Sequence, residues 1–482
     1  MLLGSAEVHP LALFRLKPLN KNAENAVNHP RNAHLVTRDK SNNLGIDIGF
    51  HTGTPCFTIA TLGREGDVFL EGQSISRMQC SFEIESSTNV PMIYDRSMTQ
   101  STTMVGRNSE SFERERTVRR VLIAPHFNKE ICIGRGEDTR IRFEIEWYRG
   151  LEETIEMAKN RRKLMGDYVV NPSLARTVPV SECASPSRQN QKKLLIRYHR
   201  TAPLGSGQFG NVWKAFNVDS GKLMAVKEIK QPLYHLKQTP GGQQTQQAFI
   251  NLSREIETLS ELKSKHPHIV DYIGSQGWDE EYIQIFMGLK DGNLGSLTHD
   301  CDPKELSTIA YCACDQMLQA LDYLAVKGIV HRDVKPENIL FESLEGGKYR
   351  FQLGDFGLCN RAVVAVTCAG TPFYMAPEMW HHGTQTHKID VWSLFVTIAW
   401  TMDAHNFRSN EKQFKSFSDV HEAVQILAET SEELQTLQEM ARTDPNNRAT
   451  AAQILLRRLH GKGLTTPRDQ ILPLPDLMSW TT

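Results

Sequence analysis

VHRDVKPENIL, residues 330–340, is the stretch of this sequence with the strongest structural and chemical signal. It places Asp333, Lys335 and Asn338 in one tight loop between a helical and a strand-like segment. A carboxylate can accept a proton from a hydroxyl group, an ammonium can neutralise negative charge, and an amide oxygen can bind a divalent cation. The loop therefore indicates a site that handles charge and protons.

The segments that follow supply a second carboxylate. A predicted hairpin with Gly346-Gly347 at its tip ends at Asp355-Phe356-Gly357, and GTPFYMAPE occupies residues 370–378. A carboxylate such as Asp355 can bridge a metal ion to phosphate oxygens. The pattern on this side of the loop thus favours phosphate chemistry.

Upstream, residues 204–212 read LGSGQFGNV, in which Gly205, Gly207 and Gly210 form G-x-G-x-x-G. That spacing alone is compatible with a dinucleotide-binding turn, a phosphate-covering hairpin or chance. A dinucleotide-binding turn opens a helix, whereas here residues 212–216 continue as a strand, and LMAVKEIK (223–230) follows a Ser220-Gly221 turn. The context favours a glycine-rich hairpin that lets phosphate oxygens approach the backbone.

Lys227 lies on the strand after that hairpin, and a predicted helix with the sequence INLSREIETLSELKS follows at residues 250–264. A lysine that contacts phosphates has to be held by a carboxylate. We expect Glu255 of this helix to do so.

In order and spacing, these segments resemble the eukaryotic protein kinases over residues 198–461. The resemblance implies an α+β bilobal fold with ATP in the cleft, and an Asp390 that anchors the catalytic loop. It also implies a structural ion pair between Glu378 and Arg448. Phe395 departs from the family, which often has Gly after WSL, and should affect packing only.

The resemblance implies ATP and Mg²⁺ as cofactors and assigns roles to particular residues. Asp333, Lys335, Lys227 and Glu255 would be catalytic, and Asn338 and Asp355 would hold the metal. ATP would contact Leu204, Gly205, Ser206, Gly207, Gly210, Val212, Ala225, Lys227, Met287, Leu289 and Leu340, with Met287 as gatekeeper and residues 288–290 as hinge.

The loop motif D-V-K-P-E-N and Gly370-Thr371-Pro372 resemble serine/threonine rather than tyrosine kinases. Arg332 precedes Asp333, an arrangement often switched by a phosphate on the activation segment. We expect Thr367 to be that phosphosite and Thr371 to hydrogen-bond Asp333 and Lys335. Glu337 either favours basic residues in substrates or is an ordinary surface residue.

The amino-terminal region, by contrast, contains short β-like runs, including CSFEIE, VPMIYD and IRFEIEWY, which predict an antiparallel sandwich or barrel. Residues 20–44 are polar and predict a long loop. The motifs around Gly63-Arg64, Ser74–Arg77 and IYDRSMTQSTTMVG resemble the forkhead-associated (FHA) domain, a β-sandwich that binds phosphothreonine. The resemblance implies a phosphopeptide site at Arg64, Ser76 and Arg77.

The sequence departs from the FHA pattern in two places, at Gln79 and at the pair Thr99 and Gln100. Gln79 replaces the structural His, although its amide can still bind the neighbouring loop. Thr99 and Gln100 stand where the family has Asn and Gly, which puts peptide affinity and phosphothreonine selectivity in doubt. A purely structural β domain is therefore the alternative.

Composition limits the remaining classes. The chain has 482 residues, which at roughly 150 per domain suggests two or three domains. Lys plus Arg number 55 against 56 Asp plus Glu, so we expect no direct nucleic-acid role. The longest apolar stretch, residues 391–400, is too short for a bilayer, and no secretory signal is evident. Nine cysteines without C-x-x-C indicate a reduced, intracellular protein of the nucleus or cytoplasm.

We therefore predict a multidomain chain: an all-β FHA-like sandwich (8–148), a helix at 151–165 with a basic linker (149–197), a kinase domain (198–461) and a tail (462–482). The basic linker is either a nuclear-import signal or a solvated connection. This order of domains resembles the checkpoint kinases. Expected partners are protein substrates and phosphothreonine proteins, with a transient homodimer as a further option. The competing hypothesis is a phosphopeptide-binding scaffold with an inactive kinase fold.

Overall fold

The structure is a computed structural model of the chain. It describes residues 8–53, 57–165, 195–207, 210–231, 250, 253, 256–262, 266–356, 360–361, 371–380 and 385–474. The chain forms two compact units, one from residues 1–202 and 214–224 and the other from residues 203–213 and 225–482. The predicted linker at 167–193 and nearly all of the polar insertion at 231–247 lie outside the described residues.

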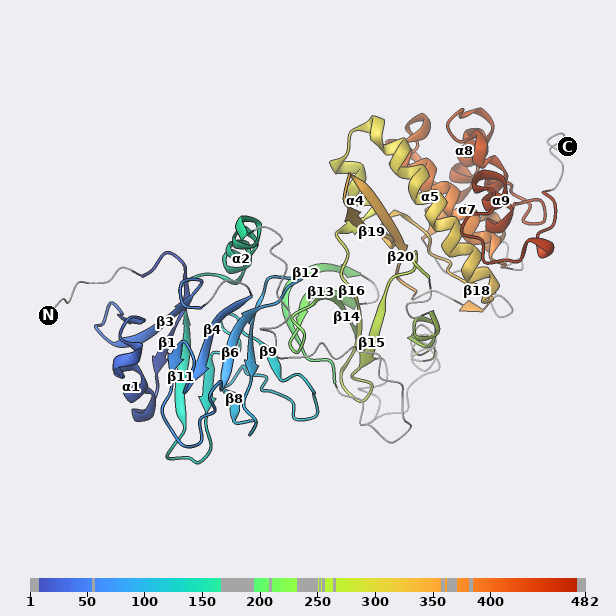
Figure 1. Ribbon diagram of the computed structural model, residues 1–482. Coiled ribbons are helices and arrows are strands. Elements are labelled where there is room, and N and C mark those ends of the chain that lie inside the picture. Colours follow the sequence, from blue (N-terminus) through green and yellow to red (C-terminus); the bar gives the residue numbers. More distant parts are fainter. Residues whose placement is uncertain are drawn as a thin grey trace. The chain divides into compact units, whose positions relative to one another are not determined.

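The first unit contains two β-sheets (Figure 1). One has the strand order β2-β3-β1-β11-β10-β8, and the other has the order β5-β4-β6-β7-β9. The strands are β1 (Ala12–Pro18), β2 (Val36–Arg38), β3 (Leu44–Gly49), β4 (Thr58–Gly63), β5 (Val68–Phe69), β6 (Cys80–Ile84), β7 (Pro91–Asp95), β8 (Thr102–Val105), β9 (Arg120–Leu122), β10 (Glu130–Ile133) and β11 (Ile141–Trp147).

The two sheets share one hydrophobic core. Phe14 of β1 and Phe82 of β6, one from each sheet, meet edge to face with ring centroids 4.9 Å apart. Alternation along β11 buries Ile141, Phe143 and Ile145 and turns the intervening residues outward, as expected for strands with one buried face. The predicted β-rich character of this region is confirmed and its two sheets are consistent with a sandwich, whereas its membership of the FHA family stays a prediction.

The prediction of a loop over residues 20–44 was wrong. The segment contains helix α1 (Lys21–Val27), a 3₁₀ turn η1 (Pro30–Asn32) and strand β2. Asn20 caps α1 by accepting a hydrogen bond from the amide of Ala23, and Ala26 and Val27 are buried. Asparagine is a favourable N-cap residue. The polar, Asn-containing segment that suggested a loop therefore begins a helix at Asn20. The predicted helix α2 (Leu151–Met165) is confirmed.

The kinase-like region begins with a five-stranded sheet of order β12-β13-β14-β16-β15. Its strands are β12 (Tyr198–Gly207), β13 (Gly210–Asn217), β14 (Leu223–Lys230), β15 (Tyr272–Gln276) and β16 (Tyr282–Gly288). The predicted glycine-rich hairpin is thus present. Residues 198–202 and 214–224 of these strands belong to the first unit.

A mainly helical region follows the sheet (Figure 1). Its helices are α4 (Leu294–Asp300), α5 (Pro303–Val326), α6 (Pro377–Trp380), α7 (Lys388–Met402), α8 (Phe417–Thr430) and α9 (Ala451–Leu459). Its strands are β17 (Gly292–Asn293), β18 (Ile329–Val330), β19 (Ile339–Leu344), β20 (Lys348–Leu353) and β21 (Asn360–Arg361). The 3₁₀ turns are η3 (Pro336–Asn338), η5 (Pro372–Tyr374), η6 (Ala404–Asn406), η7 (Glu411–Gln413), η8 (Gln435–Ala441) and η9 (Arg468–Gln470).

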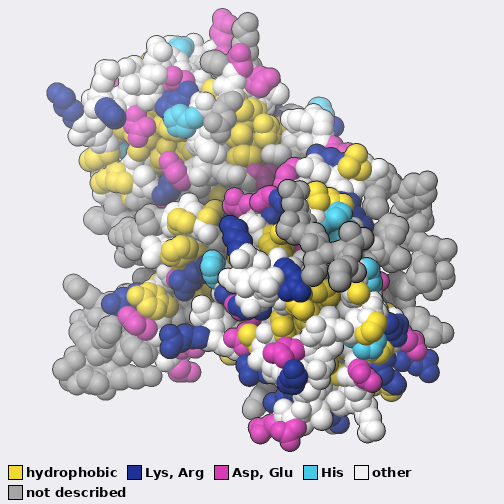
Figure 2. Space-filling view, turned by 90° about the vertical axis from the view of Figure 1, so that its left-hand side faces the viewer, with side chains coloured by type: hydrophobic (Ala, Val, Ile, Leu, Met, Phe, Trp, Pro, Cys, Tyr) yellow, Lys and Arg dark blue, Asp and Glu magenta, His cyan; other side chains and the backbone are white. Residues whose placement is uncertain are grey.

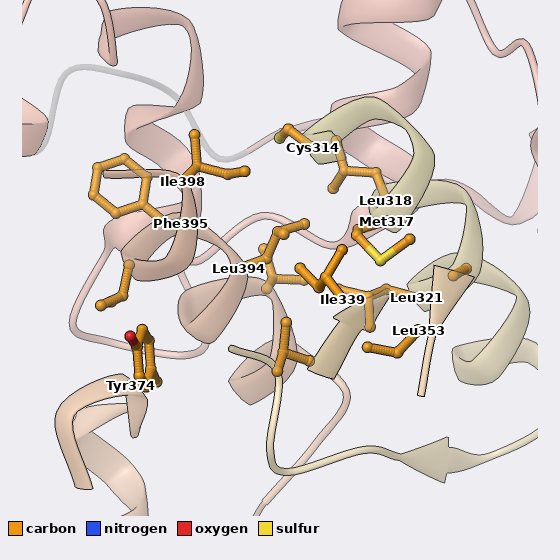
Figure 3. Packing of buried hydrophobic residues seen from close by; sticks show 14 of the residues in the cluster. Cys314, Met317, Leu318, Leu321, Ile339, Leu353, Tyr374, Leu394, Phe395 and Ile398 are labelled. Carbon is orange, nitrogen blue, oxygen red and sulfur yellow. The ribbon is translucent and has the colours of Figure 1, made fainter. Parts of the chain in front are cut away.

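Helices α5 and α7 pack together at the centre of this region. Figure 3 shows Leu318 and Leu321 of α5 close to Ile339 of β19 and to Leu394 of α7, in a cluster of buried side chains. Phe395, the departure from the family pattern, is fully buried in the same cluster. This position is consistent with the expectation that the departure bears on packing.

Charges of both signs are interspersed on the face that Figure 2 shows. This distribution agrees with the net charge of -1. Within the part of the chain that the structure describes, none of the helices has the length and apolar character needed to cross a membrane.

The predicted ion pair between Glu378 and Arg448 is present and buried. Arg448 is 0% exposed, and its two terminal nitrogens donate to the two carboxylate oxygens of Glu378 at 2.7 and 2.9 Å. A bidentate geometry of this kind fixes two segments in one register. It joins α6 to the segment before α9.

We predict that Arg448→Met lowers the free energy of unfolding by about 3–5 kcal/mol, because it leaves the Glu378 carboxylate buried without a partner. Arg350→Met, which breaks a solvent-exposed pair with Glu342, should cost less than about 1 kcal/mol. Urea unfolding of both variants measures the difference. Equal losses would contradict the structural role of the buried pair.

Candidate active site

Asp390 binds the backbone of the catalytic-loop segment through hydrogen bonds, as predicted. Its two carboxylate oxygens accept the backbone amides of His331 and Arg332 at 2.7 and 2.8 Å. Arg332 has a positive φ of 72°, which is unfavourable for a non-glycine residue and persists only where its surroundings enforce it. The His331 ring lies 3.0 Å from the carbonyl oxygen of Gly354, which joins the loop to the segment that carries Asp355.

Burial affects the pKa of the Asp390 carboxyl group. The side chain is 1% exposed, and this desolvation raises the pKa of its carboxyl, while the positive neighbours and the two amides act in the opposite direction. The amides favour the ionised form because they donate hydrogen bonds to it. The carboxylate is therefore positioned to hold the loop backbone.

The three polar residues of the loop converge on one point, together with Thr371. Lys335 Nζ lies 2.8 Å from Asp333 Oδ2 and 2.7 Å from Thr371 Oγ1. Thr371 donates its hydroxyl to Asp333 Oδ1 at 2.8 Å, and the Asn338 amide donates to Asp333 Oδ2 at 2.8 Å. The predicted contacts of Thr371 are present, and Asp333 is held in a single orientation.

Lys227 contacts the second carboxylate directly. Its ammonium lies 2.7 Å from Asp355 Oδ1, and the lysine is buried. Asp355 has a positive φ of 53°, and Phe356 packs edge to face on His331. The predicted partner Glu255 lies outside the described residues. The structure therefore pairs Lys227 with Asp355 and leaves the pairing with Glu255 a prediction.

The glycine-rich hairpin lines a cavity of about 470 Å³. Leu204, Gly205 and Val212, three of the predicted ATP contacts, belong to its wall, together with Pro203, Asn211 and Trp213. Gly210 has φ +131°, and a Cβ there would lie 2.0 Å from the Glu228 carbonyl oxygen. Only glycine fits this close approach between β13, which carries Gly210, and β14, which carries Glu228.

The remaining residues that we predicted to contact the nucleotide lie on β12, β14, β16 and β19 or directly beyond them. Ser206 and Gly207 end β12, and Ala225 and Lys227 share one face of β14. Met287 lies at the end of β16, with Leu289 just beyond it, and Leu340 lies on β19. Leu340 and Met287 border the hydrophobic core, and Leu340 Cδ1 is close to Gly354. Thr367 falls outside the described residues.

The predicted phosphopeptide residues lie on linked loops of the first unit. The Arg64 amide donates to the Ser76 carbonyl at 3.1 Å, and the Glu65 amide donates to the Arg77 carbonyl at 2.9 Å. Gln79 is fully buried, and its amide accepts from Ser76 and donates to Ser101 and Thr102. The prediction that Gln79 still ties the neighbouring loops together is confirmed.

Two arginines near these loops escaped the sequence analysis. Arg31 donates to the carbonyl of Arg64 at 3.4 Å, and Arg135 donates to the carbonyl of Thr99 at 2.7 Å. Arg31 lies in the 3₁₀ turn η1 and Arg135 in the loop between β10 and β11, both far from residues 64–77 in the sequence, and no motif singles them out. The contact of Lys227 with Asp355 was also missed, because it depends on the backbone conformation at Asp355.

Comparison with known proteins agrees with this geometry. The profile of the protein kinase domain matches residues 198–459, more than half of the chain. The chain therefore belongs to the protein kinase family.

Similar relatives include a mitogen-activated protein kinase kinase kinase and two proteins named as serine/threonine-protein kinases. "Mitogen-activated protein kinase kinase kinase 3" of Arabidopsis thaliana is 30% identical over 220 residues, 44% of this chain and 32% of that protein. "Serine/threonine-protein kinase pak-1" of Caenorhabditis elegans is 30% identical over 42% of this chain and 32% of that protein. "Serine/threonine-protein kinase STE20" of Saccharomyces cerevisiae is 31% identical over 42% and 20%. The chain thus spans about a third or less of these relatives.

We predict that Asp390→Ala speeds amide hydrogen exchange at His331 and Arg332 by roughly tenfold or more, because each lost hydrogen bond is worth about 1–3 kcal/mol in a buried setting. Peptide-level exchange mass spectrometry measures the effect. Asp444→Ala, an exposed aspartate near the end of the domain, is the control and should leave this peptide unchanged. Unaltered exchange in Asp390→Ala would contradict the anchoring role.

Proposed function

We propose that the chain is an active serine/threonine protein kinase that transfers the γ-phosphoryl group of ATP to hydroxyl groups of protein substrates. The observation that carries the proposal is the cluster of Asp333, Lys335, Asn338 and Thr371, anchored by Asp390. In it the Asp333 carboxylate, a proton acceptor, lies within hydrogen-bond distance of the Lys335 ammonium, the Thr371 hydroxyl and the amide nitrogen of Asn338. A pseudokinase commonly lacks one of these groups or one of Lys227 and Asp355, and all are present.

Each residue has a definite task in this proposal. Asp333 accepts the proton of the acceptor hydroxyl, and Lys335 stabilises negative charge on the transferring group. The Thr371 hydroxyl bridges Asp333 and Lys335 and fits the serine/threonine class. Lys227, buried beside Asp355, supplies positive charge toward the phosphates of the nucleotide.

The donor set fits a hard divalent cation, which we take to be Mg²⁺. The amide nitrogen of Asn338 donates to Asp333, so its oxygen is the atom to offer a metal, and Asp355 contributes a carboxylate. Among the described residues, no group of three or more His, Cys, Asp or Glu side chains forms a metal site of its own. Few protein ligands with phosphate oxygens completing the shell are typical of Mg²⁺. When bound, the ion would neutralise phosphate charge.

We predict that Asp355→Asn abolishes phosphate transfer, a loss of at least roughly 1000-fold, while the chain stays folded. Glu345→Gln, at the exposed tip of the β19–β20 hairpin, provides the control of equal charge change. Radiolabelled transfer to a generic substrate protein and thermal unfolding are measured for both. Full transfer by Asp355→Asn refutes the assignment, and a wild-type chain that binds ATP without turnover would favour the scaffold hypothesis.

For the first unit, we propose that the β domain binds phosphothreonine. Support comes from the two-sheet core, the Gln79 network and the arginines on adjoining loops. Guanidinium groups form strong charge-assisted bonds with phosphate. Arg77 also pairs with Glu65 at 3.5 Å, but both side chains are mostly exposed, so this pair is weak and can yield to a ligand.

Such a reader would either recruit phosphorylated partners or bind a phosphothreonine of a second copy and bring two kinase domains together. Both roles require the same contact with phosphate. Thr99 and Gln100 favour the alternative of a purely structural domain. Phosphopeptide binding decides between reader and structural domain.

We predict that the full chain binds phosphothreonine peptides and that Arg64→Ala weakens this binding roughly tenfold or more, since a charge-assisted bond is worth about 1.5–3 kcal/mol. Arg107→Ala, at the opposite end of β8 from the 97–101 loop, should leave affinity unchanged. The affinities of the wild-type chain and of both variants are measured by fluorescence polarisation with a phosphothreonine peptide library and its unphosphorylated counterparts. Absence of phospho-dependent binding would establish the structural alternative.

A further inference from the structure

The tip of the β13–β14 hairpin, residues 217–222, is built into the core of the first unit. Phe216 and Val218 belong to that unit's hydrophobic core and are 4% and 0% exposed. The Leu122 amide, at the end of β9, donates to the Val218 carbonyl at 2.8 Å, and the Val218 amide donates to the Arg197 carbonyl at 3.0 Å. The hairpin tip is therefore joined by a backbone hydrogen bond to β9, the edge strand of one sheet of the β domain.

Asp219 forms the charged centre of this contact. Its side chain is only 4% exposed, and it pairs with Arg116 at 2.8 Å and with Arg197. Arg120 donates to its carbonyl oxygen at 2.9 Å. A buried carboxylate is tolerated only when it is paired, and here arginines from the β domain and from the segment before β12 supply the partners.

The turn itself is fitted to the β domain. Gly221 has φ +71°, and a Cβ there would lie 2.9 Å from Met92 Sδ and 3.0 Å from Val90 Cγ2. Thr88 donates its hydroxyl to the Gly221 carbonyl at 2.8 Å. Hydrophobic, ionic and backbone contacts thus hold the same six residues.

The two strands that leave this tip carry the nucleotide-binding residues. β13 runs back without interruption to Val212 and Gly210, and β14 runs on to Ala225 and Lys227. Fixing the tip therefore restricts how far the glycine-rich end of the hairpin can move. Since the phosphates of a nucleotide need this end in one position, the tip contact bears on nucleotide affinity.

We propose that Asp219 is a positioning residue through which the amino-terminal β domain holds the glycine-rich hairpin in its nucleotide-binding conformation. The β domain then has a structural role that it exerts through the strands of the hairpin, besides any role as a phosphothreonine reader. The effect on catalysis rests on the proposed kinase function, whereas the effect on hairpin motion does not.

The test uses the full chain with Asp219→Asn and, independently, Arg116→Gln, which alters no residue of the kinase domain. Both should accelerate amide exchange of residues 210–216 and 225–227 by roughly tenfold and raise the KM for ATP about five- to tenfold, within the usual range of coupling between sites. kcat at saturating ATP should fall less than about twofold, because chemistry is untouched. In the double variant the effects should not add, since the two residues share one ion pair.

Asp279→Asn, in the turn between β15 and β16, is the matched control and should change neither exchange nor KM. Exchange of peptides from α5 and α7 reports whether a variant stays folded, and Arg116→Gln remains decisive if Asp219→Asn unfolds. Unchanged exchange of the glycine-rich strands in both variants would overturn the proposal. If the wild-type chain lacks activity, the kinase assignment fails, but the exchange measurement still decides the role of Asp219.

Discussion

The hydrogen bonds from two loop amides to the buried carboxylate of Asp390 are the constraint on which the candidate active site depends. They stabilise a backbone conformation at Arg332 that is unfavourable in isolation. That conformation turns the chain so that Asp333 points toward Lys335 and Thr371, while His331 reaches the carbonyl of Gly354. The position of Asp355 follows from the same contacts, because Gly354 precedes it and Phe356 packs on His331.

Much of this arrangement could be predicted from the sequence, because its segments resemble the protein kinases and that resemblance implies a role for each matching residue. The loop, Asp390, the Glu378–Arg448 pair and the contacts of Thr371 are of this kind. The direct contact of Lys227 with Asp355 could not be predicted, since it arises from a left-handed backbone at Asp355. A local conformation of that sort leaves no pattern in hydrophobicity or spacing.

In the first unit, less of the detailed structure could be predicted from the sequence than in the candidate active site. Alternating apolar residues predicted its β character, but strands β2, β3, β8 and β10 and helix α1 were not predicted individually. Their sequences are short. Strand β8 pairs with β10 rather than with β7 or β9, its neighbours in the sequence, whereas β10 also pairs with the following strand β11. Asn20 illustrates the difficulty, because asparagine favours both loops and helix caps, and only the burial of Ala23, Ala26 and Val27 decides between them.

The boundary between the two units is the feature that sequence reasoning describes least well. Motifs place the start of the kinase domain at residue 198, yet compactness assigns residues 198–202 and 214–224 to the β domain. A motif reports the chemistry of a fold, whereas a structural unit is defined by which side chains exclude water together. Val218 and Asp219 carry no kinase signature, and their burial among residues of the β domain explains why residues 214–224 belong by sequence to one domain and by packing to the other.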